Sequence, residues 1–110
     1  MTAGDVLILR FPFSDLSGSE LRRAVVLADV GRGDFIAYQI TSNRDADPRA
    51  IELQPASFPS GALNATSYAR PGKLFTAHLS IVAKRVARVT DAVKEAIKKA
   101  LIDLVQRGSL

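Results

Sequence analysis

Two arginines and a pair of hydroxyl residues are the side chains whose types and spacing could act on a phosphate. Arg22 and Arg23 stand immediately before one apolar run, and Thr41 and Ser42 close the next one. Guanidinium groups match phosphate oxygens in shape and stay protonated at any relevant pH. An arginine and a threonine directed at one phosphate could stabilise the charge that develops as a ribose 2′-hydroxyl attacks it, without a metal.

Patterns typical of other catalytic classes are missing from the sequence. There is no cysteine, no phosphate-binding glycine loop, no zinc-binding helix motif and no serine elbow. Acidic residues occur singly along the chain, so we expect neither a metal site nor a cofactor. The one histidine, His78, stands at or just past a predicted strand, where a surface or half-buried role is commoner than a catalytic one.

A hairpin would bring the arginines and the hydroxyl residues together. The apolar runs Ala24–Val30 and Phe35–Thr41 flank Gly31–Asp34, whose glycines suit a tight turn. Pairing about this turn places Arg22–Ala24 opposite Thr41–Ser42, within side-chain reach across the strands. Spacing alone nevertheless favours a simpler interpretation, namely a surface arginine and a threonine of high strand propensity.

The remaining elements are predicted to be short strands followed by one helix. Further strands are expected at Val6–Phe11, Ala50–Leu53, Lys73–Ala77 and Ala83–Val89, with loops at Ser14–Glu20, Ser42–Arg49 and Gln54–Thr66 and a tight turn at Pro71-Gly72. The C-terminal helix should be capped by Thr90 or Asp91 and end at Gly108. The sequence therefore predicts a mostly β fold with one C-terminal α-helix, in which an antiparallel sheet curls into a small barrel.

Composition narrows the class of protein and its partners. With 110 residues, the chain is expected to form a single domain over residues 1–110. The absence of cysteine, of a signal peptide and of any apolar run near the ~20 residues of a membrane span predicts a cytoplasmic protein. The net charge is +4, and no carboxylate occurs between Leu53 and Thr90. Such a basic stretch suits a polyanionic partner, although ordinary solubility charge explains it equally well.

Three blocks of the sequence resemble the MazF/PemK-like toxins of type II toxin–antitoxin systems. They are GDVLILRFPFSDLSGSELRRAVVL from Gly4, Gln39-Ile40-Thr41-Ser42, and SYARPGKLFT from Ser67, and they follow one another in the family's order over nearly the whole chain. The resemblance implies an SH3-like barrel with a terminal helix, usually a homodimer. It also implies a metal-independent endoribonuclease that cuts single-stranded RNA at short sequences and is held by a cognate acidic antitoxin.

The resemblance also assigns roles to individual residues. Arg22 takes the place of the family's catalytic arginine, Thr41 that of its catalytic threonine, and Glu20 a position near the site in some relatives. Arg23 stands where the family has a proline, so which arginine is directed inward stays open. Residues expected to contact RNA are Ser17, Arg23, Ser42, Arg44, Arg70 and Lys73.

Two other functions share the expected barrel. One is a non-hydrolytic poison like CcdB, which binds DNA gyrase through the end of its C-terminal helix and needs no arginine–hydroxyl pair. The other is an RNA-binding barrel without catalysis. The pairing of Arg22 with Thr41 favours the endoribonuclease.

Overall fold

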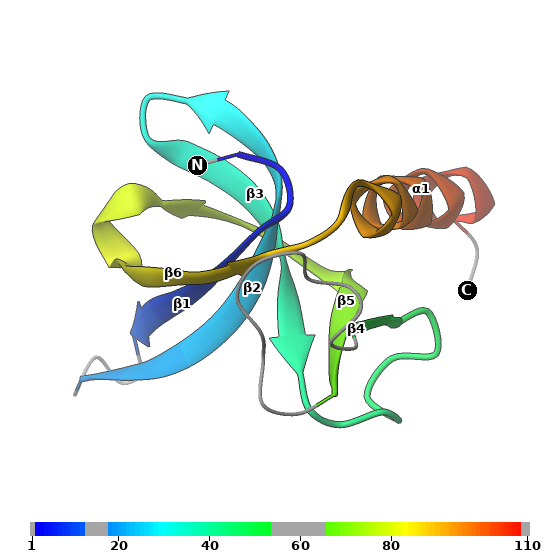
Figure 1. The fold of residues 1–110 in the computed structure, drawn as a ribbon, viewed down its shortest axis with the longest axis horizontal. Coiled ribbons are helices and arrows are strands. Elements are labelled where there is room, and N and C mark those ends of the chain that lie inside the picture. Colours follow the sequence, from blue (N-terminus) through cyan, green and yellow to red (C-terminus); the bar gives the residue numbers. More distant parts are fainter. Residues whose placement is uncertain (1, 13–17, 54–65, 109–110) are drawn as a thin grey trace.

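A computed structural model describes residues 2–12, 18–53 and 66–108 of the chain (Figure 1). Its elements in order are β1 (Asp5–Pro12), β2 (Ser19–Gly31), β3 (Asp34–Thr41), β4 (Ile51–Leu53), β5 (Ser67–His78), the 3-10 helix η2 (Leu79–Ile81), β6 (Val82–Arg88) and α1 (Asp91–Arg107). The predicted class, mostly β with one C-terminal α-helix, is confirmed.

The strands form one antiparallel sheet in which strands on opposite sides come close together. Its order is β4-β5-β3-β2-β1-β6, so β5 and β6 flank the central strands on opposite sides. Only the three residues of η2 join the end of β5 to the start of β6. The sheet has to curl for such a short link to span its two sides, which agrees with the small barrel predicted from the sequence.

The predicted β2–β3 hairpin is present. Gly31 and Gly33 take positive φ angles of 90° and 82° in its turn, which glycine adopts at little cost, and Arg32 between them has a φ of 58°. In the observed register, Ala24 pairs with Gln39 and Arg23 with Ile40.

Two predicted boundaries were wrong. β2 begins at Ser19 rather than Ala24, because its pairing with β1 continues through Phe11–Glu20 and Pro12–Ser19. Residues at the end of the expected loop are therefore strand residues.

β5 is the second corrected element. It starts at Ser67 rather than Lys73 and contains Pro71-Gly72, which were predicted to form a turn. The register explains the difference, because Gln39 pairs with Arg70 while the preceding Tyr38 pairs with Leu74. Residues 71–73 form an irregularity in which the proline is not required to donate to the ladder.

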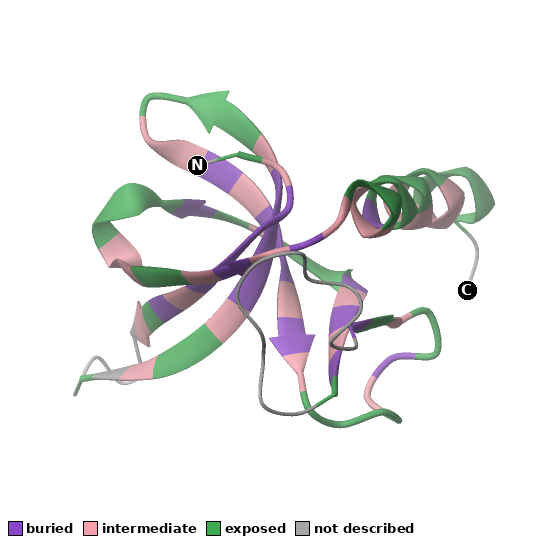
Figure 2. Cartoon of the chain, in the orientation of Figure 1, coloured by how far each residue is buried: buried purple, intermediate pink, exposed green. Residues whose placement is uncertain are grey.

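The sheet carries apolar side chains on both faces. We call the side packed against α1 the helix face; it includes Val25, Tyr38, Ile40 and, from the helix, Ile97. We call the opposite side the inner face; it includes Leu7, Leu9, Ala24, Val26, Phe35, Ala37 and Ala77. Figure 2 shows buried positions along the central strands, and Figure 1 shows α1 to one side of them.

The helix is fixed at its ends and near its middle. The Thr90 side chain accepts a hydrogen bond from the Val93 N–H, and Gly108 closes the other end in the left-handed conformation, both as predicted. The buried hydroxyl of Tyr38 donates to the carbonyl oxygen of Ile97 at 2.7 Å. In the described part of the chain, no helix is both long and apolar enough to cross a membrane.

Candidate active site

The two adjacent arginines point to opposite faces of the sheet. Arg23 pairs with Ile40, a residue of the helix face, and its Nη1 donates to the Ser67 hydroxyl at 2.6 Å. Arg22 shares its face with Ala24, because side chains alternate along a strand, and therefore belongs to the inner face. This alternation favours Arg22 as the arginine of the site and gives Arg23 a structural contact.

Arg22 is held by a carboxylate and an aromatic ring. Its Nε donates to Glu20 Oε1 at 2.8 Å, and its Nη2 contacts the same oxygen. The guanidinium carbon lies 5.4 Å from the centre of the Phe11 ring, a cation–π distance. Phe75 supports that ring edge-on, with centroids 5.1 Å apart and planes at 74°. The side chain still has 42% of its surface exposed, so the remaining N–H groups can reach a ligand.

Thr41 ends the neighbouring strand with its hydroxyl hydrogen available. Its Oγ1 accepts a hydrogen bond from the Asn43 N–H at 3.1 Å, and a hydroxyl that accepts can still donate. The hairpin register, continued one residue past Arg23–Ile40, sets Arg22 across from Thr41. Both residues share the inner face, so a guanidinium and a hydroxyl lie on adjacent strands at its end.

Thr41 also has a partner on its other side. It pairs with Tyr68 of β5, and Tyr68 in turn pairs with Glu52 of β4. Directly paired residues share a face, so Arg22, Thr41, Tyr68 and Glu52 form one line across β2, β3, β5 and β4. We call these four residues the polar row.

The other residues predicted to contact RNA lie in several places. Ser42 and Arg44 are exposed in the loop after β3, and Lys73 is exposed at the irregularity in β5. Ser17 lies outside the described residues. None of these three described side chains belongs to the polar row.

Arg70 supports a loop. Its Nη2 donates to the Ala46 carbonyl at 2.9 Å, and its Nε lies 3.8 Å from the buried carboxylate of Asp47. Asp47 also accepts from the backbone N–H groups of Arg49 and Gly72. Arg70 thus helps to tie residues 42–50 to β5, next to Gln39 and close to the polar row.

Sequence reasoning missed Phe11, Tyr68 and Glu52. Tyr68 stands within the SYARPGKLFT block, but its place beside Thr41 depends on the β3–β5 register across the irregularity. Phe11 reaches Arg22 only because β2 begins early enough to pair with it. Period-two alternation would have put Glu20 and Arg22 on one face had the strand start been known.

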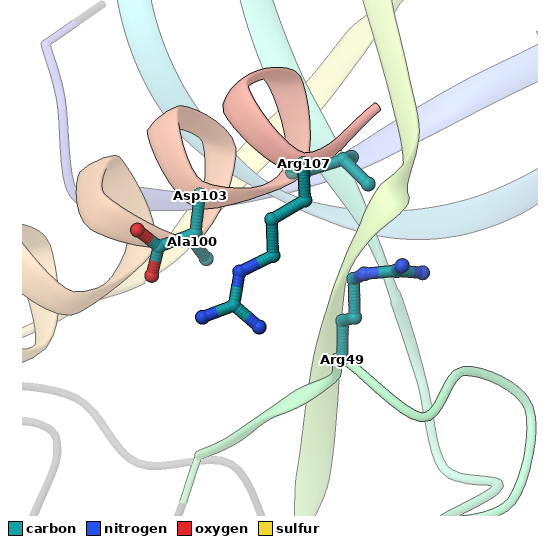
Figure 3. Close-up of a pocket in the computed structure, with 5 residues that line it drawn as sticks. Arg49, Ala100, Asp103 and Arg107 are labelled. Carbon is teal, nitrogen blue, oxygen red and sulfur yellow. The ribbon is translucent and has the colours of Figure 1, made fainter. Parts of the chain in front are cut away.

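Two other features lie apart from the polar row. A cavity of about 200 Å³ is lined by Arg49, Ala100, Asp103, Leu104 and Arg107, and Figure 3 shows the Arg107 side chain extending from α1 into this space. No residue predicted for the site lines it. His78 is exposed, and its Nδ1 accepts from the Ser80 N–H. Among the described residues, no three His, Cys, Asp or Glu side chains gather as a metal site would require.

Comparison with known proteins gives a consistent result. Residues 2–105 match the sequence profile described as PemK-like, MazF-like toxin of type II toxin–antitoxin systems. No curated protein matches the sequence.

Several solved structures share the fold. A MazE–MazF complex from Deinococcus radiodurans is 18% identical, with a TM-score of 0.76 and 96% of each chain covered. A mycobacterial endoribonuclease in complex with its cognate antitoxin is 18% identical, with a TM-score of 0.74 over 96% of this chain and 95% of that chain. The Mycobacterium tuberculosis toxin MazF-mt6 is 10% identical, with a TM-score of 0.68 over 91% of this chain and 96% of that chain.

Proposed function

Because the chain belongs to the PemK-like, MazF-like toxin family of type II toxin–antitoxin systems, we propose that it is an endoribonuclease that cleaves single-stranded RNA at short sequences. The observation that carries this proposal is the placement of Arg22 and Thr41 on one face of adjacent strands, with the guanidinium already oriented by Glu20 and Phe11. Solved relatives named as endoribonucleases support it.

The proposed reaction is attack of a ribose 2′-hydroxyl on the neighbouring phosphorus. The 2′-oxygen–phosphorus bond forms and the bond to the 5′-oxygen breaks, which leaves a 2′,3′-cyclic phosphate and a 5′-hydroxyl. Arg22 donates to the non-bridging oxygens as negative charge builds on them, and Thr41 donates to the same phosphate and fixes its position. The Glu20 carboxylate orients Arg22 and accepts the proton of the attacking hydroxyl, while solvent protonates the leaving 5′-oxygen.

The partners proposed with this activity follow from charge and family. The chain carries a net charge of +4, which favours both RNA and an acidic antitoxin. MazF proteins solved together with MazE support the antitoxin. We propose a homodimer that acts in the cytoplasm without a metal or cofactor; exposed apolar side chains such as Ile102 and Val105 on α1 favour self-association. The exposed Ser42, Arg44 and Lys73 are proposed to contact the RNA backbone.

The test is cleavage of a long RNA by the purified protein in EDTA. The wild-type protein should produce discrete fragments with 5′-hydroxyl ends. Arg22→Ala should lower the cleavage rate about 10²–10³-fold, the usual cost of losing one group that stabilises transition-state charge. Arg107→Ala, an exposed arginine in the last turn of α1, is the matched control and should cleave at the wild-type rate.

Other outcomes would redirect the proposal. Intact RNA together with inhibited DNA gyrase would support the gyrase-poison alternative. Cleavage that survives in Arg22→Ala but is lost in Arg23→Ala would move the catalytic role to the neighbouring residue.

A further inference from the structure

The polar row extends beyond the two residues that act on the phosphate. Thr41 pairs directly with Tyr68, and Tyr68 pairs directly with Glu52, so the two side chains continue the row on the side away from Arg22. Neighbouring strands lie about 4.8 Å apart, and a group next to the phosphate at Thr41 would therefore meet Tyr68 first and Glu52 second. In RNA, the ribose next to the phosphate carries a nucleobase, and this base would lie over these two side chains.

Tyr68 offers an aromatic surface at this point. Its side chain is half-buried, and within the described ranges its ring stacks on no other aromatic side chain. Phe11 and Phe75, by contrast, pack against each other beneath Arg22. Aromatic rings bind single-stranded nucleic acid by stacking on the bases, because every base has a π-face.

Glu52 has no evident structural role on the inner face. It is exposed, and among the described residues no cation lies within ion-pair distance of its carboxylate. Its neighbours Ile51 and Leu53 pack on the opposite, helix face. A carboxylate at the edge of a phosphate site repels the RNA backbone, but it can accept hydrogen bonds from the N–H groups of a base edge.

We propose that Tyr68 and Glu52 form a nucleobase subsite beside the scissile phosphate. Tyr68 stacks on the base, and Glu52 accepts hydrogen bonds from an exocyclic amino group. The subsite therefore takes guanine, cytosine or adenine and rejects uracil, whose Watson–Crick edge presents carbonyl oxygens on both sides of its single N–H. Guanine fits best, since its adjacent N–H groups can meet both carboxylate oxygens. This subsite rests on the proposed endoribonuclease function and names one element of its specificity.

The experiment sequences the ends produced from an RNA of random sequence. For the wild-type protein, uracil should be depleted about tenfold or more at one position next to the cut, since one base contact of this kind discriminates by roughly 5- to 150-fold. Glu52→Gln should remove most of that depletion, because the glutamine amide can donate to a uracil carbonyl. Glu95→Gln, an exposed glutamate on α1, is the matched control and should keep the wild-type base profile.

The stacking residue has its own readout. Tyr68→Leu should raise KM about tenfold with a smaller change in kcat, because stacking on one base contributes roughly this factor in binding. Tyr68→Phe keeps the ring and should restore the wild-type KM. Equal KM values for Tyr68→Leu and the wild type would overturn the stacking role.

A binding arm separates failure of the subsite from failure of the proposed function. Short single-stranded oligonucleotides rich in cytosine or in uracil are titrated into the Thr41→Ala protein and its Glu52→Gln double variant. The single variant should bind the cytosine-rich strand several-fold more tightly, and the double variant should bind both alike. If Glu52→Gln changes neither the base profile of cleavage nor the binding preference, the subsite is refuted. If the binding preference is present but the wild-type protein does not cleave RNA, only the nuclease is refuted.

Discussion

The helix face and the inner face of the sheet have different roles although the same central strands contribute to both. On the helix face, contacts join residues far apart in the sequence: Tyr38 to Ile97, 59 residues away, and Arg23 to Ser67, 44 residues away. At the end of the inner face, the hydrogen-bonding partner of Arg22 is Glu20, two residues away, and both side chains are partly exposed. Among the described side chains, the one distant residue there is Phe75, which reaches Arg22 only through the Phe11 ring. Long-range buried contacts stabilise a fold, whereas short exposed contacts position a side chain at little cost to stability.

This difference means that stability and cleavage should respond to different substitutions. Changes on the helix face should lower the free energy of unfolding and leave the cleavage rate of each folded molecule nearly unchanged. Changes at Arg22 or Thr41 should lower the cleavage rate and leave the free energy of unfolding nearly unchanged. The following three predictions try to break this separation.

The largest effect on stability is expected for Ile97→Ala. Ile97 is fully buried and packs with the helix-face cluster, and truncating such a side chain costs about 2–5 kcal/mol. Urea titration should show this loss, while cleavage per folded molecule at low temperature stays within a few-fold of wild type. Lys99→Ala, at an exposed position of the same helix, is the control and should change stability by much less. A cleavage defect as large as that of Arg22→Ala would show that the faces are coupled.

Much of the helix face could be predicted from the sequence. The apolar period of the C-terminal segment, the Thr90 cap and the Gly108 stop are local signals, and each corresponds to the observed element. The glycine-flanked turn likewise fixed the hairpin that sets Arg22 across from Thr41.

The rest of the site depends on register between strands that are distant in the sequence. Tyr68 and Glu52 join the polar row only because β5 breaks its register around residues 71–73, where the sequence suggested a turn. Such an irregularity depends on how the partner strand is paired rather than on local propensity. Similarly, β2 starts early because it pairs with β1, and no local sequence signal indicated where this pairing begins.

Arg23→Ala tests the difference between the two faces at adjacent residues, because Arg23 lies on the helix face and the proposed catalytic Arg22 on the inner face. It removes the hydrogen bond from Nη1 to the buried Ser67 hydroxyl and should cost about 1.5–3 kcal/mol of stability, the range for hydrogen bonds of charged groups. Activity per folded molecule should fall far less than in Arg22→Ala, which should in turn barely change the urea midpoint. If Arg23→Ala instead abolishes cleavage at unchanged stability, Arg23 contacts RNA as the sequence suggested.

The smallest effect at neutral pH, and one that grows in alkali, is expected for Tyr38→Phe. Losing the hydrogen bond to the Ile97 carbonyl should cost about 1 kcal/mol at pH 7. Burial raises the pKa of the Tyr38 phenol from 10.0 to about 12, so between these values the unfolded chain has released this proton while the folded chain retains it. The raised pKa therefore contributes to the free energy of unfolding in full below pH 10, and this contribution is lost as the pH rises toward 12. Urea titrations at pH 8, 10 and 11 should therefore show a steeper decline for the wild type than for Tyr38→Phe. Tyr68→Phe, which leaves Tyr38 in place, is the control, and its free energy of unfolding should fall with pH as that of the wild type does. Parallel declines of the wild type and Tyr38→Phe would mean that the phenol ionises without opening the contact between helix and sheet.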